Sequence, residues 1–430
     1  MMKKIELPAR ENWDNLCRRP EIPRNDLENT VRDIIKRVKE EGDTALNYFT
    51  EKFDGVLPGN LKVRPAEISG SAAFVAEPLK KAIETAKKNI KNFHSVQLIN
   101  EPVVETAKGV KCWRKSVPVE KVGLYIPGGS APLFSTLLML GIPAKLAGCE
   151  EIIICTPAGK DGLISQVILY TAQLIGISEI YKIGGAQAIA AMAYGTGSVP
   201  KVYKIFGPGN QYVTKAKELV QQDGIAIDMP AGPSEVLIIA DEKTNPVFVA
   251  ADLLSQAEHG PDSQVILLSD SLALINKVES EIEAQLENLP RKNIAVRALE
   301  NSKLILLPTL NDCIELSNLY APEHLIINTS DAKALANKVK NAGSVFLGEY
   351  SCESAGDYAS GTNHTLPTNR YARSYSGVSM ESFVKKITFQ ELNIDGLRNI
   401  GPAIELMAAA ESLDGHKNAV NVRLKSLKND

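Results

Sequence analysis

Short apolar runs alternate with helix-patterned stretches from about residue 120 onward, and this alternation constrains the fold more than any other feature of the chain. Each run is rich in Ile, Val and Leu, which is typical of buried strands. Strands that alternate with helices predict parallel sheets covered by helices. We therefore expect an α/β fold with two doubly wound, Rossmann-like α/β domains. The runs form two series, at residues 122–126, 151–155, 180–183 and 202–206, and at residues 236–240, 265–268, 304–307, 325–327 and 345–347.

The two series also suggest how the chain is divided, with one α/β domain inserted into the sequence of the other. Before the first series, apolar residues at i, i+3, i+4 and i+7 predict a buried helical stripe over residues 31–38. Near the end, we expect one helix over residues 402–413 and another from about residue 417. The expected units are an N-terminal extension (1–20), a first α/β domain (21–124 with 235–378), a second α/β domain that carries the glycine-rich turns (125–234), and a C-terminal helical segment (379–430).

Charge and composition exclude several classes of function. The chain has 48 Lys and Arg against 51 Asp and Glu, and a net charge of -3 gives no electrostatic basis for binding nucleic acid or a membrane surface. The most apolar stretch, residues 131–147, is interrupted by Ser135, Pro143 and Lys145, so it does not predict a membrane span. The first residues lack the apolar core of a signal peptide. We therefore expect a cytoplasmic protein with no nucleic-acid and no membrane partner.

The cysteines do not form a recognisable pattern. All six are scattered along the chain, and none belongs to a C-x-x-C pair. This argues against a disulfide framework and against a zinc site built from cysteine. A metal site in this chain would rely on His, Asp, Glu or Gln side chains.

Glu323 and His324 form the most informative pair of polar residues. They follow Pro322 and stand at the start of an apolar run, residues 325–327, that is expected to be a strand. Two different proton acceptors at one place can serve two different proton-transfer steps. Alternatively, the two residues belong to a turn before the strand, with both side chains in solvent.

Three glycine-rich turns follow expected strands, at residues 127–130, 184–187 and 207–210. Glycine lets the backbone approach a ligand, and the N-terminus of a following helix favours an anion, so the turns indicate a nucleotide or phosphate ligand. The third turn comes nearest to a dinucleotide fingerprint, because Asp228 follows about 20 residues later, where a ribose partner is expected. Tyr212 occupies the position of the third glycine, so we reject the standard fingerprint. Alternatively, the turns end strands for steric reasons alone.

A set of possible metal ligands contains no cysteine. Gln256 and His259 are three residues apart in the last turn of a helix that Asn245 can cap, so their side chains project from one side. Asp357, in an expected loop, and His416, just beyond a helix end, offer further ligands. A mixed N/O set of this kind suits zinc or manganese. On spacing alone, a polar helix end with a favourable C-terminal histidine explains Gln256 and His259 more simply.

Together, these segments resemble the histidinol dehydrogenase family over nearly the whole chain. Several motif segments in the right order are far more specific than any single glycine turn. The segments are VGLYIPGGSAPL at 122–133, GGAQAI at 184–189, FGPGNQY at 206–212, PAGPSE at 230–235, LSQAEHG at 254–260, APEH at 321–324, GD at 356–357 with NHTLP at 363–367, and DGHKN at 414–418.

The resemblance implies a zinc-dependent, NAD-linked four-electron oxidation of L-histidinol to L-histidine through bound L-histidinaldehyde, the last step of histidine biosynthesis. It also implies one Zn2+ per subunit and a homodimer in which the C-terminal segment reaches the partner subunit. The residues that it implies are Glu323 and His324 for catalysis; Tyr125, Gln187 and Asn210 for NAD; Ser234, Gln256, His259, His324, Asp357, Glu411 and His416 for substrate; and Gln256, His259, Asp357 and His416 for zinc.

Two adjacent bases suit a two-stage reaction. His324 would accept the alcohol proton as hydride leaves for NAD, and Glu323 would then activate water at the aldehyde. Two alternatives stay open. A zinc hydrolase with Glu323 as general base leaves the glycine turns unused, and a nucleotide-binding regulatory protein leaves Glu323 and His324 unused.

Overall fold

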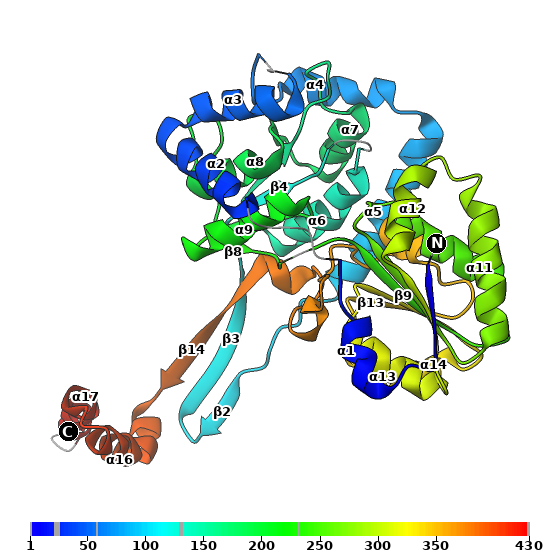
Figure 1. Ribbon diagram of the computed structural model, residues 1–430. Helices are drawn as coiled ribbons and strands as arrows, with labels where there is room; N and C mark the ends of the chain where they lie inside the picture. The colour runs from blue at the N-terminus through cyan, green and yellow to red at the C-terminus, as the bar shows by residue number, and fades with distance from the viewer. Residues whose placement is uncertain (1, 21–25, 57–58, 129–131, 231, 428–430) are drawn as a thin grey trace.

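The structure is a computed structural model, and it describes residues 2–20, 26–56, 59–128, 132–230 and 232–427. Two parallel sheets with flanking helices form its main body, and a third, antiparallel sheet projects from this body (Figure 1). The expected α/β class with two doubly wound units is confirmed. Among the described residues, no helix combines the length and apolar character that crossing a bilayer requires.

The larger parallel sheet holds the second series of apolar runs. Its strand order is β1-β11-β10-β9-β12-β13, and apolar cores lie on both of its faces. Burial on both faces explains why four of the six residues in each of β9 and β10 are Val, Ile or Leu. Its strands are β1 (Lys3–Glu6), β9 (Glu235–Ala240), β10 (Gln264–Ser269), β11 (Lys303–Leu306), β12 (His324–Asn328) and β13 (Ser344–Leu347). Its helices are α1 (Trp13–Leu16), α10 (Pro246–Ala257), α11 (Leu272–Leu286), α12 (Lys292–Glu300), α13 (Leu310–Tyr320), α14 (Ala332–Ala336) and α15 (Glu353–Tyr358).

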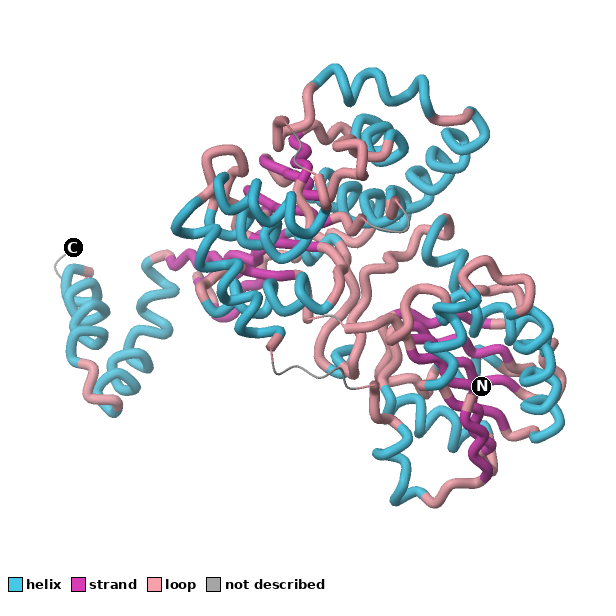
Figure 2. Tube along the Cα trace, turned by 45° about the horizontal axis from the view of Figure 1, so that its top comes forward, coloured by secondary structure: helices cyan, strands magenta, loops and turns pink. Residues whose placement is uncertain are grey.

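The smaller parallel sheet holds the first series. Its strand order is β6-β5-β4-β7-β8, so the chain runs outward from β4 to one edge and then continues on the other side of β4. Figure 2 shows the two parallel sheets in magenta as separate layers, each with its own helices. Its strands are β4 (Lys121–Tyr125), β5 (Glu151–Thr156), β6 (Glu179–Lys182), β7 (Lys204–Phe206) and β8 (Ala226–Ile227). Its helices are α6 (Phe134–Ala147), α7 (Gln166–Ile175), α8 (Gly185–Tyr194) and α9 (Gln211–Gln222).

The N-terminal helices pack on the smaller sheet's unit. The stripe expected within residues 31–38 is buried, and it belongs to the same apolar core as α8 and α9. This packing differs from the expected grouping of residues 21–124 with 235–378, because the apolar stripe faces helices of the 125–234 unit. The domain boundaries themselves stay a prediction. The helices are α2 (Leu27–Glu41), α3 (Asp43–Asp54), α4 (Pro65–Gly70) and α5 (Glu77–Ser95).

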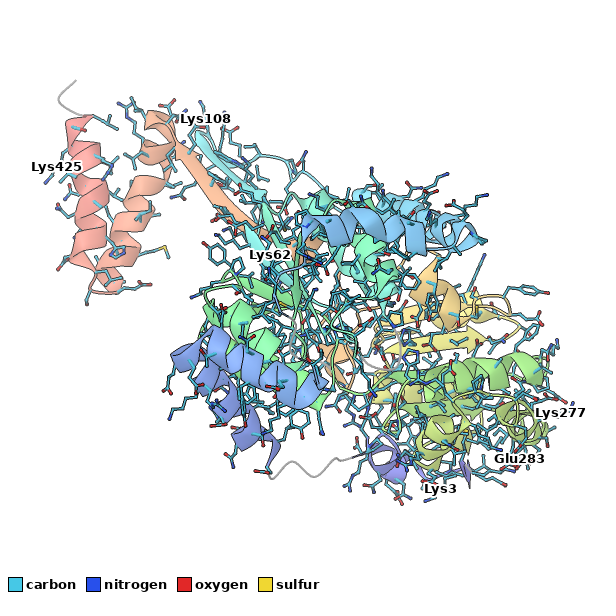
Figure 3. All side chains as sticks on the ribbon, turned by 90° about the horizontal axis from the view of Figure 1, so that it is seen from above. Lys3, Lys62, Lys108, Lys277, Glu283 and Lys425 are labelled. Atoms are coloured by element: carbon cyan, nitrogen blue, oxygen red, sulfur yellow. The ribbon has the colours of Figure 1, made fainter. Side chains whose placement is uncertain are left out.

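A projecting arm carries the end of the chain. Its antiparallel sheet joins β2 (Val104–Ala107), β3 (Val110–Pro118) and β14 (Val384–Leu392), and its tip holds α16 (Ile394–Ala410) and α17 (Asp414–Ser426). The expectation of a helix that begins at residue 402 is wrong, because Asn393 caps α16 and accepts a hydrogen bond from Gly396 N at 2.8 Å. Pro402 therefore lies inside the helix. In Figure 3, Lys108 and Lys425 lie on this arm, away from Lys277 and Glu283 of the main body.

Candidate functional site

Glu323 and His324 lie at the amino end of β12, where α13 has just ended. The connection is tight, because Ala321 takes a left-handed conformation (φ 55°) and Pro322 follows. Both side chains are buried, with 7% and 4% exposure, so the alternative of a solvated turn does not hold. A buried acid beside a buried imidazole needs compensating partners.

Carboxyl groups supply these partners. His324 Nδ1 lies 3.6 Å from Glu323 Oε2 and 3.6 Å from Glu353 Oε1, while Nε2 lies 3.5 Å from Asp357 Oδ1. Glu323 Oε2 also accepts a hydrogen bond from Glu235 N at 2.9 Å. Three carboxyl groups therefore face one imidazole inside the protein.

The pKa values of this cluster are shifted by burial and by neighbouring charge. Burial raises the pKa of Glu323, because the carboxylate is removed from water. Burial alone would lower the pKa of His324, but the negative charges of Glu353 and Glu323 outweigh it and raise that pKa. The cluster therefore holds protons at a pH where solvent-exposed carboxyl groups would have lost them, and it is poised for proton transfer.

Helix α10 carries Gln256 and leads to His259. As expected, Asn245 caps this helix, and its side chain accepts a hydrogen bond from Val247 N at 3.0 Å. Gln256 is buried in the last turn, where its amide nitrogen can donate to Glu353 Oε1 at 2.7 Å. His259 follows with an exposed side chain and interacts electrostatically with Asp357 and His324.

Helix α15 brings in Glu353 and Asp357. The expectation that Asp357 lies in a loop is wrong, since it lies one helical turn after Glu353 and both side chains point to His324. The ligand atoms of His324, Glu353 and Asp357 all lie within 4.8 Å of one another, a spacing that could hold a metal ion. Sequence reasoning missed Glu353, although its i, i+4 relation to Asp357 was a usable signal.

The buried cluster borders the smaller sheet's unit. His364 Nδ1 lies 2.9 Å from the Asp357 carbonyl oxygen, and its Nε2 lies 3.2 Å from Thr136 Oγ1 in the first turn of α6. Asn363 donates to the Met139 carbonyl of the same helix at 2.7 Å. The two α/β units therefore meet beside Asp357.

The glycine-rich turns lie at the carboxyl edge of the smaller sheet. Gly207 (φ 127°) approaches Tyr125 so closely that an added Cβ would lie 2.1 Å from its carbonyl oxygen. The Tyr125 hydroxyl accepts a hydrogen bond from Gly185 N at 3.1 Å, so all three turns gather around this tyrosine's strand. Strands β4 and β7 flank the point where the strand order reverses, which is where open α/β sheets bind ligands. Residues 129 and 130 of the first turn lie outside the described residues.

Two expected ligand contacts lie in or beside these turns. Gln187 is buried in the first turn of α8, and neither polar atom of its amide has a hydrogen-bond partner among the described residues. Asn210 is exposed and caps α9, with its side-chain oxygen accepting from Tyr212 N at 3.0 Å.

Asp228 does not have the role that its spacing suggested. Its carboxylate forms an ion pair with Lys217, and it accepts hydrogen bonds from Gly207 N at 2.8 Å and Met229 N at 2.7 Å. With 1% of its side chain exposed, it cannot reach a ribose. The expectation of a ribose partner at Asp228 is therefore wrong, and the residue holds the turn at Gly207 instead.

The remaining expected residues are divided between the cluster and the arm. Ser234 directly precedes β9 and is half-buried next to Glu235, whose backbone N–H donates to Glu323. Glu411 and His416 are exposed on the arm, and the described contacts of α16 and α17 are with each other and with the arm's strands. Within one chain, the structure therefore does not bring these two residues to Gln256, His259 and Asp357.

Two doubly wound sheets with a buried acid–base cluster at their junction define an α/β enzyme. The model of the family described as histidinol dehydrogenase matches residues 17–424. The histidinol dehydrogenase of Bacteroides thetaiotaomicron is 59% identical to this chain over 428 residues, and the match covers 100% of both chains. The histidinol dehydrogenase of Aliivibrio fischeri is 52% identical, and the match covers 96% of this chain and 94% of that protein. The crystal structure of histidinol dehydrogenase from Elizabethkingia anophelis has a TM-score of 0.97 and 56% identity, covering 99% of each chain.

The chain belongs to the histidinol dehydrogenase family, and it is an oxidoreductase. The resemblance drawn from the motif segments is therefore confirmed. The alternatives of a hydrolase and of a regulatory protein without catalysis are not favoured by this membership.

Proposed function

We propose that the protein oxidises L-histidinol to L-histidine in two NAD-linked steps, with one Zn2+ per subunit and with L-histidinaldehyde held between the steps. This is the last step of histidine biosynthesis, and we place it in the cytoplasm. The observation that carries the proposal is the buried pair of Glu323 and His324 inside a cluster of carboxyl groups, in a chain of this family.

The residues around His324 fit a divalent cation. His324 Nε2, Asp357 Oδ1 and Glu353 Oε2 are buried without a hydrogen-bond partner among the described residues. Gln256, His259 and Asp357, with His416 from a second copy of the chain, would hold zinc, which would act as a Lewis acid and orient the amino alcohol.

The smaller sheet's edge fits a dinucleotide. The unpartnered amide of Gln187 offers one donor and one acceptor group, and the close contact of Gly207 with Tyr125 holds the third turn against β4. With Asn210 at the start of α9, these residues would hold NAD at the point of strand reversal. NAD would accept the hydride of each step.

With zinc bound, its positive charge would lower the raised pKa values of Glu323 and His324, so that both groups could act as bases and divide the proton transfers between them. In the first step, His324 would accept the hydroxyl proton while the carbon loses hydride, which gives the aldehyde. In the second, Glu323 would accept a proton from the water that adds to the aldehyde, and loss of a second hydride from the hydrate gives the carboxylic acid. Burial of both groups keeps bulk water from the aldehyde between the steps.

The arm supports a homodimer in which each chain completes the other's site. Glu411 directly follows α16 and His416 lies in α17, and α16 also exposes large apolar side chains, including Leu406 (74%) and Met407 (67%). Apolar surface of this kind on a projecting element is typical of an interface. We propose that it docks on a second copy, where the two polar residues join Gln256 and Asp357.

The first test is direct. Purified, zinc-loaded protein is mixed with histidinol and NAD, and the absorbance of reduced NAD is followed together with the histidine formed. We expect two reduced NAD for each histidine, because alcohol and aldehyde are each oxidised once. No reduced cofactor from protein of measured zinc content would contradict the proposal.

The second test addresses the exchange between chains. Glu323→Gln and His416→Asn proteins are each made, then mixed under conditions where dimers exchange. If each site combines Glu323 of one chain with His416 of the other, one of the two sites in every mixed dimer contains neither substitution. Because random exchange makes about half of the dimers mixed, about a quarter of wild-type turnover should return. Without a shared site, each chain carries its own defect, and mixing restores nothing.

A further inference from the structure

Arg19, in the N-terminal segment that the sequence left without a function, is buried next to the catalytic pair. Its Nε and Nη2 atoms donate to Glu235 Oε1 and Oε2, both at 2.8 Å, in a two-pronged ion pair. Only 9% of the Arg19 side chain and 1% of the Glu235 side chain are exposed. The guanidinium also lies 3.6 Å above the ring of Tyr320. Planar, two-pronged contacts of this kind fix geometry as well as charge.

Glu235 transmits this fixed geometry to both bases. Its backbone N–H donates to Glu323 Oε2 at 2.9 Å, and its carbonyl oxygen lies 3.2 Å from His324 Nδ1. Its carboxylate also accepts a hydrogen bond from Asn369 N at 2.9 Å. A rotation of the Glu235 backbone would therefore disturb Glu323 and His324 together.

A second route runs through the turn before Glu323. Arg19 Nη2 lies 3.5 Å from the carbonyl oxygen of Ala321, the residue that takes the left-handed conformation. For a residue other than glycine, that conformation is strained and persists only where its surroundings hold it. Tyr320, which lies under the guanidinium, is fixed at its other end by a 2.9 Å hydrogen bond from its hydroxyl to Gln264 Oε1. Arg19 thus contacts both residues that lead into the bend.

We infer that Arg19 is a positioning residue, which holds Glu323 and His324 in place through Glu235 and through the bend at Ala321. The inference rests on the proposed function of these two bases. Arg19 itself faces Glu235 and Tyr320 and takes no part in the chemistry. Through Arg19, the N-terminal segment helps to hold the site in place, although Arg19 and Glu235 are 216 positions apart in the sequence.

The test compares Arg19→Met with Arg18→Met, a neighbouring arginine whose side chain is exposed. In Arg19→Met, we expect kcat for both histidinol and supplied histidinaldehyde to fall about 10- to 100-fold, the size of effect that small displacements of catalytic groups produce. The KM values for histidinol and NAD should stay within about twofold, because Arg19 contacts neither ligand in the proposed site. Arg19→Lys keeps the positive charge but loses the two-pronged contact, so its kcat should lie between those of wild type and Arg19→Met.

Thermal unfolding of each variant separates positioning from a loss of folded protein. If Arg19→Met fails to fold, the same comparison is made with Arg19→Lys. A fall in its kcat with KM nearly unchanged supports the inference, and an unchanged kcat contradicts it. A double substitution, Arg19→Met with Glu235→Gln, should lower kcat little further than either change alone, because both act on one contact. Unchanged kcat in folded Arg19→Met, or an equal fall in Arg18→Met, would overturn the inference.

A readout independent of turnover distinguishes this failure from failure of the proposed function. The chain has five histidines, so histidine-selective labelling gives few resonances, and the His324 signal is assigned by its loss in His324→Asn. The His324 ring resonance should move in Arg19→Met and stay in place in Arg18→Met. An unmoved His324 signal contradicts the inference even where the protein oxidises histidinol, whereas a moved signal without any such oxidation supports the inference and counts against the proposed function.

Discussion

Replacing Lys217 with methionine should loosen the turn at Gly207 while leaving the rest of the fold in place. Lys217 and Asp228 form an ion pair whose side chains are 4% and 1% exposed. Lys217 also donates to the Gly207 carbonyl at 2.9 Å, and Asp228 accepts from the Gly207 N–H at 2.8 Å. Both backbone groups of one glycine are thus held by one buried pair.

The expected magnitude follows from what the substitution leaves behind. Removing one partner of a buried ion pair costs about 3–5 kcal/mol, because the other charge stays buried. Asp228 keeps two backbone donors, Gly207 N and Met229 N, at 2.8 and 2.7 Å, so its charge is partly compensated. We therefore expect the turn at Gly207 to lose about 3 kcal/mol of stability, the low end of this range. This loss raises the equilibrium constant for opening of the turn by a factor of about 10².

Hydrogen exchange at Gly207 and Met229 measures this opening, and calorimetric titration with NAD measures its effect on the proposed cofactor site. Lys215→Met on the same helix is the matched control. Lys215 pairs with Glu218 near the surface, an interaction of about 0–1 kcal/mol. Adding Asp228→Asn to Lys217→Met should recover part of the loss, since no buried charge remains.

Equal exchange rates in Lys217→Met and Lys215→Met would refute the reasoning. So would a double variant less stable than Lys217→Met alone, because the loss would then not come from a stranded charge.

Three further outcomes are expected. Glu323→Gln should slow oxidation of supplied histidinaldehyde by about 10²-fold or more, and stopped-flow kinetics should show a smaller loss in the alcohol step, whereas equal losses would assign the glutamate elsewhere. His259→Asn should lower both turnover and the zinc retained after gel filtration, measured by atomic emission, and full zinc retention would remove His259 from the ligand set. Burial raises the pKa of Asp54 from 3.8 to about 6, so its ionisation opposes folding increasingly as pH rises from about 4 to 6 and by a constant amount above. Because this side chain is partly exposed, Asp54→Asn should stabilise the fold by only about 1 kcal/mol at pH 7 and by almost nothing at pH 4, as urea unfolding at the two pH values would show; equal effects at both would contradict the shifted pKa.

The parallel sheets could be predicted because burial on both faces leaves a direct mark on the sequence. Strands such as β9 and β10 each contain a continuous run of four Val, Ile and Leu residues, and the helices between them separate the runs clearly. The arm left no such mark. Strand β14 carries polar and charged residues along much of its length and is mostly exposed, so nothing distinguished it from a loop before the C-terminal helices.

The site was predictable where its residues are neighbours in sequence and much less so where only the fold unites them. Glu323 and His324 stand side by side, and a helix places Gln256 near His259. Arg19 and Glu235 meet only because the N-terminal segment lies beside β9, and no local pattern signals that contact. Asp228 is the opposite case. Its spacing suggested a contact with a ligand, whereas in the structure it is buried and paired with Lys217.

The first strand has a consequence for how the protein is made. β1 pairs in parallel with β11, so that Lys3 lies beside Lys303, and the edge of the larger sheet closes only after about 300 residues have been synthesised. During translation, β1 must wait without its partner while the inserted β4–β8 sheet can already assemble. Pairing across so long a separation is entropically demanding and slow. Strand β1 therefore stays unpaired until β11 has been synthesised, and during that time its backbone is open to wrong pairing.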